Sequence, residues 1–419
     1  MSFRQTILNV ATIFAVSVSA LAIDVADPKK AGFSPEKLAA LESHFQSYVD
    51  NNKLAGLTTL IARRGELVHF KTYGMLDKAA STPMPDNAVF RIFSMTKPVT
   101  GVALMMLWED GKFKLDDPVS KYLPEFKNQQ VFSGLADDGT MKTADPKRVM
   151  TIRDLMRHTG GLTYGVFGDT PVDRAYRGAG VMSPENDLKA MVEKLAAQPL
   201  LYQPGEAWVY SLSTDVLGRL IEVLSDMPLD AFFSKNIFEP LHMTDTSFSV
   251  REDQKDRFAE IYVLDKEKGL TTYRGDFYRD FTKKPSFLSG GGGLVSTTMD
   301  YWKFAQLVAN GGILNDTRLL KSSTIDMMRV DQLPETLQGI GGGKTGLGFG
   351  LTFAVVKDTE KAKSKGRVGE YFWGGLASTL FWIDPEEEVV AMVMTNFMTS
   401  QVYPLRQDMR TYVYEALAE

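Results

Sequence analysis

The apolar residues of segment 35–49 recur at helical spacing and predict an amphipathic helix near the start of the chain. Ser34 and Pro35 precede this pattern, and the pair is typical of a helix start, because serine caps free N–H groups and proline needs no hydrogen bond there. The apolar face comprises Leu38, Leu41, Phe45, Tyr48 and Val49. We therefore expect a surface helix with one buried face and one face in water.

β-Branched and aromatic residues dominate short runs at both ends of the chain. These runs lie at 57–63, 66–73, 347–356, 370–384 and 388–397. The first two are broken at Arg64-Gly65 and the last two at 384–386, which predicts two hairpins. Residues 403–419 are expected to close the chain as a helix. The sheet strands are thus expected to come from both ends of the sequence.

The segment from Ser94 to Glu109 is long enough for about four helical turns. Its apolar residues cover every side of the predicted helix: Val99, Val102, Ala103, Leu104, Met105, Met106, Leu107 and Trp108. A helix of this kind belongs in a protein core. Pro98 places the helix start close to Ser94, because proline is tolerated in the first turn only.

Between about 120 and 285 the pattern changes to short helical stretches and long polar loops, including a charged segment around 251–285. A glycine-rich turn then leads into an amphipathic helix from about Thr298 to Asn310. These patterns predict an α+β fold with an antiparallel sheet flanked by N- and C-terminal helices. We expect residues 23–119 and 286–419 to form the α/β lobe and residues 120–285 to form an inserted, mostly helical lobe.

The composition is that of a globular domain, with 44% apolar and 24% charged residues in a chain of 419. The net charge of −5 gives no basic footprint for a nucleic acid. The absence of cysteine excludes disulfides and a thiolate nucleophile, and the four histidines have no metal-ligand spacing. Neither pattern nor composition fixes an oligomeric state.

The first 22 residues resemble an export leader, because Arg4 precedes a mildly apolar run that ends at Ala20-Leu21-Ala22. A leader of this kind predicts a periplasmic or secreted protein. The alternative is an uncleaved leader on a cytoplasmic protein, since Asn9, Thr12 and Ser17 dilute the apolar run. After this leader, no apolar run approaches the ~20 residues that a membrane-spanning helix needs.

Ser94 and Lys97 are three residues apart at the start of the buried helix, so their side chains are expected to share a face. A serine hydroxyl becomes a good nucleophile when a neighbouring base takes its proton, and a buried lysine can be that base. The same spacing recurs at Ser34 and Lys37, where capping and solvation explain both residues. Capping could also explain Ser94, but it gives no role to a buried Lys97.

With Ser94-Met95-Thr96-Lys97, the chain resembles the serine β-lactamase and penicillin-binding-protein superfamily, whose signatures are Ser-x-x-Lys, a second polar motif and Lys-Thr-Gly. Within it, the sequence is most similar to the class C β-lactamase-like esterases, called family VIII carboxylesterases. The likeness covers about 28–415, through "LDDPVSKYLPEF", "TIRDLMRHTGGL", "QPGEAWVYS", "SGGGGLVST" and "YFWGGLASTLFWIDP". It implies a β-lactamase-like fold, an acyl-enzyme on Ser94, a small ester as substrate and no cofactor or metal.

The second motif of class C β-lactamases is Tyr-x-Asn, and here it is Tyr210-Ser211-Leu212. The resemblance assigns Tyr210 to share the serine proton with Lys97, which suits a phenol beside an amine. Leu212 stands at the substrate-binding position where the family's asparagine donates a hydrogen bond to a β-lactam amide. Leucine cannot donate, so penicillins are expected to be poor substrates, with weak cephalosporin hydrolysis possible.

Two stretches compete for the third motif. Lys344-Thr345-Gly346 spells the β-lactamase signature, but Trp373-Gly374-Gly375 precedes the expected hairpin and has the form that the esterase branch uses. We assign the motif to Trp373, Gly374 and Gly375 as substrate-binding residues whose glycines let the backbone approach the substrate. Lys344 is then a surface lysine. By resemblance, the N–H groups of Ser94 and Leu376 form the oxyanion hole.

Other functions remain open at this point. A β-lactamase, a D-alanyl carboxypeptidase and an acyltransferase would all use the same acyl-serine. A Ser-His-Asp hydrolase with His158 as base is disfavoured, because the sequence has no Gly-x-Ser-x-Gly motif, and we expect His158 to bond backbone groups at a helix end. A non-catalytic protein that binds cell-wall fragments or lactams would not need Ser94, Lys97 and Tyr210 together.

Overall fold

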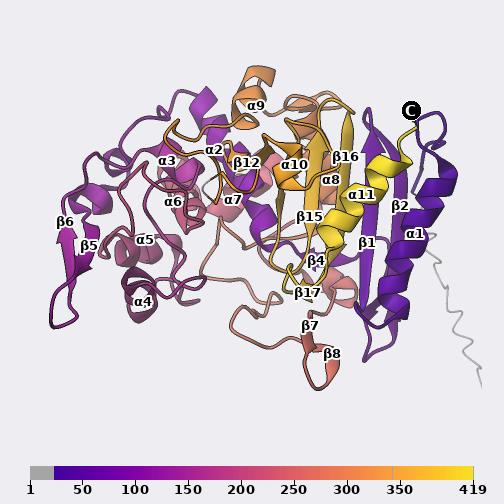
Figure 1. Cartoon of the computed structure of the whole chain (residues 1–419), viewed down its shortest axis with the longest axis horizontal. Coiled ribbons are helices and arrows are strands. Elements are labelled where there is room, and N and C mark those ends of the chain that lie inside the picture. The colour runs from indigo at the N-terminus through magenta and orange to yellow at the C-terminus, as the bar shows by residue number, and fades with distance from the viewer. Residues whose placement is uncertain (1–22, 342, 419) are drawn as a thin grey trace, which may run out of the picture.

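An eight-stranded antiparallel sheet organises the structure (Figure 1). The computed structural model describes residues 23–341 and 343–418, so the predicted leader lies outside the described residues. No helix of these residues is long and apolar enough to cross a membrane. In sheet order, the strands are β12 (Leu347–Phe349), β13 (Ala354–Val356), β14 (Tyr371–Gly374), β15 (Leu380–Asp384), β16 (Val389–Thr395), β1 (Gly56–Arg63), β2 (Glu66–Asp77) and β3 (Thr82–Pro83).

Helices cover both faces of this sheet. Helices α1 (Pro35–Asp50) and α11 (Leu405–Ala416) pack together over one face, with α1 beside β2 and α11 over β16 in Figure 1. Helix α8 (Thr298–Ala309) packs against β15 and β16 on the other. Successive strand residues point to opposite faces, so Leu57 and Ile61 join the core under α1, whereas Leu60 joins the core under α8. The α+β architecture expected from the sequence is confirmed.

The strands agree with the predicted runs, but two runs are divided within the main sheet, and Phe397 at the end of run 388–397 belongs to a separate short strand. Run 347–356 becomes β12 and β13, because the N–H groups of Leu351 and Thr352 bond to Met328 and Met156 outside the sheet. Run 370–384 becomes β14 and β15, joined by a turn in which Gly375 N–H donates to the Thr379 carbonyl. A β-rich composition therefore located the sheet but not the bends within it.

The segment 120–285 contains five α-helices and two hairpins within the described residues. The helices are α3 (Ile152–Met156), α4 (Pro171–Gly178), α5 (Leu188–Ala196), α6 (Ser213–Ser225) and α7 (Leu229–Phe233). The hairpins, absent from the sequence prediction, are β5 (Val131–Leu135) with β6 (Met141–Ala144), and β7 (Tyr262–Asp265) with β8 (Gly269–Thr272). Strand β7 also pairs with the short β17 (Phe397–Met398), which ties this segment to the C-terminal part of the chain.

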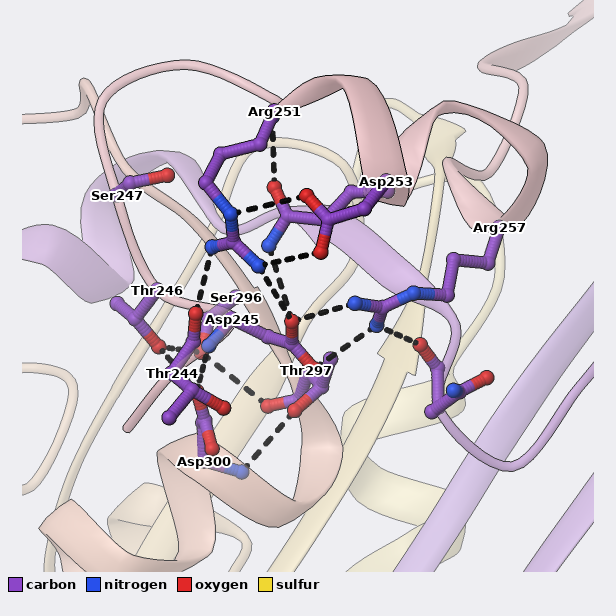
Figure 2. Close-up of polar contacts among 12 residues, drawn as sticks. Thr244, Asp245, Thr246, Ser247, Arg251, Asp253, Arg257, Ser296, Thr297 and Asp300 are labelled. Carbon is purple, nitrogen blue, oxygen red and sulfur yellow. Dashed lines mark hydrogen bonds and ion pairs between the residues drawn. The ribbon is translucent and has the colours of Figure 1, made fainter. Parts of the chain in front are cut away.

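A polar cluster links residues 244–257 to the start of α8 (Figure 2). Asp245 forms ion pairs with Arg251 and Arg257, and its N–H donates to Asp300 at 2.7 Å. Asp300 lies in the first turn of α8, where Thr297 caps the helix. Burial alone would raise the pKa of Asp245, but hydrogen bonds from Arg257 and Gln254 outweigh it and lower that pKa. The cluster therefore fixes the position of the start of α8.

The predicted core helix is α2 (Thr96–Glu109), and it is buried on nearly every side. It begins two residues later than the sequence indicated, because Phe93–Met95 form a separate 3-10 turn. A short ribbon of β4 (Val89–Arg91) and β9 (Val295–Thr297) leads into this turn. The ribbon brings the glycine run 290–293, which precedes β9, close to the N-terminus of α2.

Candidate active site

Ser94 lies in the 3-10 turn that precedes α2, half-buried at the edge of a cavity. Helix α2 continues directly from this turn, so Lys97 lies about one turn after Ser94. The residue before Ser94 is strained, since Phe93 has φ of +42°, a region that aromatic residues seldom adopt. Such strain is retained at functional sites when the surroundings hold it in place. The Tyr301 hydroxyl, which donates to the Met95 carbonyl at 2.8 Å, is one of the groups that hold it.

Lys97 is fully buried on the first turn of α2. Its Nζ donates to Ser94 Oγ at 3.3 Å, to the Gly291 carbonyl at 2.6 Å and to the Tyr164 hydroxyl at 3.4 Å. Among the described residues, no carboxylate oxygen lies within 4.0 Å of this nitrogen. Neutral groups thus hold the amine and direct it at Ser94. The sequence predicted this contact between Lys97 and Ser94.

Tyr210 approaches Ser94 from the stretch that leads into α6, more than one hundred residues away in sequence. Its hydroxyl donates to Ser94 Oγ at 2.5 Å, and its ring lies 4.6 Å from Lys97 Nζ. Trp373 packs on the same ring at 5.5 Å between centroids. A hydroxyl, an amine and a phenol therefore meet at one point, as a shared proton-transfer group would require.

Two further residues of this cluster escaped the sequence analysis. Tyr164 follows the third helix and accepts a hydrogen bond from Lys97; burial raises its pKa well above the usual value, with Asp215 and Tyr210 contributing. Asp215, on α6, is fully buried, and burial raises its pKa although Lys97 opposes the shift. Its Oδ1 accepts from Ser289 Oγ at 2.5 Å and from the N–H of Gly291 at 3.1 Å. No sequence motif marks either residue.

The glycine run 290–293 makes this arrangement possible. A Cβ atom at Gly291 would lie 2.4 Å from Asp215 Oδ2, and one at Gly290 would lie 2.8 Å from the Thr214 carbonyl. Both contacts are closer than real Cβ atoms allow, so helix α6 can approach the run only because side chains are missing there. This approach places the Gly291 carbonyl against Lys97.

The cavity beside Ser94 has a volume of about 250 Å³ and is mainly aromatic. Its apolar wall includes Phe167, Met182, Phe277, Phe281 and Phe287. Much of this wall comes from 276–287, part of the segment that the sequence marked only as charged. Aromatic side chains set between charged ones fold inward, which a composition average does not reveal. The cavity therefore suits an apolar ligand.

Leu376 lines the same cavity, in the turn that connects β14 to β15. Among the hydrogen bonds of the described residues, neither the N–H of Leu376 nor that of Ser94 has an intramolecular acceptor. Two free N–H groups that flank a nucleophile are the elements of an oxyanion hole. The oxyanion hole that the sequence predicts at Ser94 and Leu376 stays a prediction, with both N–H groups free beside the cavity.

The structure places the other predicted substrate-binding residues differently. Leu212 is fully buried in the main hydrophobic core, so its side chain offers no surface to a substrate. Gly374 and Gly375 approach protein atoms and not the cavity: a Cβ atom would lie 2.7 Å from the Arg406 guanidinium or 2.4 Å from the Ile92 carbonyl, respectively. That Leu212, Gly374 and Gly375 contact substrate stays a prediction, and the structure adds that the Leu212 side chain is buried and that the two glycines lie close to protein atoms. Trp373 packs against Tyr210 and positions it from one side.

His158 does not act on Ser94. It ends α3 in the left-handed conformation with φ of +58°, and its Nδ1 is bonded to Ser211 Oγ at 3.0 Å, not to backbone groups as expected. Burial, and then Lys97, lowers its pKa well below the usual value, so the ring is neutral. Within the described chain, no group of three or more His, Asp or Glu residues is placed to hold a metal ion.

Lys344 is exposed in a turn before β12, away from the residues that surround Ser94. Its neighbour Thr345 donates to the Ile340 carbonyl at 2.7 Å and so stabilises this turn. We expect Lys344→Ala to change kcat/KM for an ester by less than about twofold, as is usual for exposed substitutions. Steady-state kinetics checks this. A loss of about a hundredfold would return the third motif to Lys344.

The chain is similar to known proteins over most of its length. The model of the family described as Beta-lactamase matches residues 41–414. Protein Rv1367c of Mycobacterium tuberculosis is 33% identical over 84% of this chain and 88% of its own length, and Esterase EstB of Burkholderia gladioli is 29% identical over 88% and 93%. The solved structure of EstCE1, a hydrolase with promiscuous acyltransferase activity, superposes with a TM-score of 0.76 at 26% identity, covering 90% of this chain and 99% of that one.

Proposed function

The chain belongs to the beta-lactamase family and is a serine hydrolase, and on this basis we propose that it is a carboxylesterase acting on short- to medium-chain esters. The observation that carries the proposal is the position of Ser94 Oγ, within hydrogen-bond distance of Lys97 and Tyr210 at the edge of an apolar cavity. The esterase among its relatives supports the same reaction class.

In the proposed acylation step, Ser94 Oγ attacks the ester carbonyl while its proton moves to the Lys97–Tyr210 pair. The hydroxyl contact of 2.5 Å can carry a proton in either direction, since both groups donate and accept. The carbonyl oxygen becomes an oxyanion that accepts from the N–H groups of Ser94 and Leu376. The C–O bond to the alcohol then breaks, the alcohol leaves with the proton, and an ester of Ser94 remains.

In deacylation, the same pair removes a proton from water, which attacks the acyl-serine carbonyl. The second tetrahedral intermediate uses the same two N–H groups, and its collapse returns the proton to Ser94 and releases the acid. Tyr164 and the Gly291 carbonyl hold Lys97 in place through both steps. The chain of bonds through Gly291 also couples Lys97 to buried Asp215.

Ester specificity is favoured over β-lactam specificity by two features of this chain. Leu212 replaces the amide donor of the family motif, and Trp373 replaces the lysine that holds a penicillin carboxylate. The same two losses weigh against a D-alanyl carboxypeptidase, whose peptide substrates also carry an amide and a carboxylate. The aromatic cavity favours an ester with an apolar body.

An acyltransferase is the second candidate, because an apolar cavity beside an acyl-serine can bind an alcohol in place of water. EstCE1 has such activity as a promiscuous property. Product analysis in the presence of a primary alcohol separates the two functions: a transferase gives mainly the new ester, and an esterase gives mainly the acid.

A panel of p-nitrophenyl acetate, butyrate and octanoate, with benzylpenicillin and a cephalosporin as comparators, tests the proposal. We expect turnover of the esters and a kcat/KM for benzylpenicillin lower by a factor on the order of 10³ or more, because the donor to the lactam amide is missing. Initial rates measured by absorbance check this. Benzylpenicillin hydrolysis as fast as that of the best ester would assign the protein to the β-lactamases instead.

A further inference from the structure

Arg406, on the first turn of α11, reaches the turn between β14 and β15 from outside the cavity. Its Nη2 donates to the carbonyl of Gly375 at 2.5 Å and to that of Thr379 at 3.1 Å. The Gly375 carbonyl and the Leu376 N–H belong to one planar trans peptide, so they point in opposite directions. A hydrogen bond that fixes the carbonyl therefore also fixes the direction of this N–H.

The glycines of the third motif make this contact possible. A side chain at Gly374 would place its Cβ 2.7 Å from the Arg406 guanidinium. At Gly375, a Cβ would lie 2.4 Å from the carbonyl of Ile92, two residues before Ser94. The two glycines thus let the Leu376 peptide lie between the arginine on one side and the Ser94 turn on the other.

The same turn is held by further backbone contacts. The N–H of Gly375 donates to the Thr379 carbonyl at 3.0 Å, and the Leu376 carbonyl accepts from the N–H of Ser400 at 3.1 Å. The Leu376 N–H is left without an acceptor among the described residues, although its neighbours are bonded. A free donor set between bonded peptides is preorganised for a ligand oxygen.

The charge of Arg406 is not used in an ion pair. Within the described residues no carboxylate lies within 4.0 Å of it, and its Nε is buried without an acceptor. Arg410, one turn later on the same helix, is bonded to Glu370 at 2.7 Å. Burial lowers the pKa of Arg406 to about 10, so the guanidinium stays charged at neutral pH. A cation on the carbonyl polarises the whole peptide and strengthens its N–H as a donor.

We propose that Arg406 is a positioning residue of the oxyanion hole, which orients and polarises the Gly375–Leu376 peptide so that its N–H binds the developing oxyanion. This inference rests on the proposed esterase function. Arg406 touches neither the substrate nor Ser94, and it acts through the peptide that it holds. Its removal should therefore weaken transition-state binding and leave ground-state binding unchanged.

The test compares Arg406→Met and Arg406→Lys with Gln407→Met, a substitution at the exposed neighbouring position on α11. For p-nitrophenyl butyrate we expect Arg406→Met to lower kcat about 10- to 100-fold with KM within about twofold, because losing a whole oxyanion donor costs about 10²- to 10³-fold. Arg406→Lys should be intermediate, since an ammonium can reach one carbonyl. Gln407→Met should match the wild type.

A boronic acid that forms a tetrahedral adduct on Ser94 provides the decisive readout. Its inhibition constant should rise in Arg406→Met by the same factor by which kcat falls, with the pH profile of kcat/KM unchanged in shape. Unchanged boronate affinity would overturn the proposal, as would a shifted pH profile, which would mean that Arg406 acts through Tyr210. If Arg406→Met does not fold, Arg406→Lys carries the same comparison. Failure of the wild type to hydrolyse esters would instead refute the proposed function itself.

Discussion

Replacing Ser94 by alanine is expected to lower kcat for p-nitrophenyl butyrate by a factor on the order of 10⁴ or more. The alanine removes the hydroxyl that both Lys97 and Tyr210 contact, whereas the cavity and the candidate oxyanion N–H groups remain. Residual catalysis from binding and the oxyanion hole alone is small in related acyl-transfer enzymes. Steady-state rates and intact-mass spectra, in which only the wild type gains one acyl group, check this expectation.

The alanine variant should remain folded, because Ser94 is half-buried in a turn that backbone contacts hold. Its thermal midpoint is expected within a few degrees of the wild type, since the change removes one hydroxyl. Retention of most of the ester turnover by a folded Ser94→Ala protein would refute the acyl-serine mechanism. Lys344→Ala, treated identically, serves as the active reference.

The sequence predicted those contacts of the catalytic cluster that join residues close together in the chain. Ser94 and Lys97 are one turn apart, so their contact follows from spacing and burial alone. The contact with Tyr210 required the family resemblance, because 113 residues separate it from Lys97 and no local rule joins them. The sheet was predicted for a similar reason, as alternation and hairpin turns are local signals.

What the sequence could not predict depends on tertiary packing. Asp215 reaches the Gly291 N–H because the glycine run lets α6 approach it, and Tyr164 accepts from Lys97 across the fold; a single tyrosine or aspartate in sequence has no mark of either contact. Leu212 was read as a substrate contact from its motif position, yet core packing buries it completely. The glycines of the third motif were assigned to substrate, and the structure shows that the missing side chain at Gly374 also makes room for Arg406. A close backbone approach at these glycines was predicted, but Arg406 was not predicted to be the group that approaches.

Lys97→Met and Lys97→Arg together test which form of the amine the mechanism needs. We expect both variants to lose activity about 10³-fold, within the range for a positioned general base, because methionine cannot accept a proton and arginine is always protonated. If Lys97 served only as a fixed positive charge, Lys97→Arg would keep most of the activity. Rates of acylation measured by stopped flow, with Tyr210→Phe alongside, distinguish these roles.

The methionine variant also separates the effect of losing the amine from the effect of changing the packing of the buried site. Methionine matches the length of the lysine stem and fills the same fully buried site, while the Gly291 carbonyl loses its donor. One unpaired carbonyl costs about 1–3 kcal/mol, which a thermal unfolding scan resolves but which leaves a protein of this size folded. A folded Lys97→Met enzyme with near-normal acylation would mean that Tyr210 alone, 2.5 Å from Ser94 Oγ, takes the proton. Loss in Lys97→Met with full activity in Tyr210→Phe would instead assign the proton to the amine.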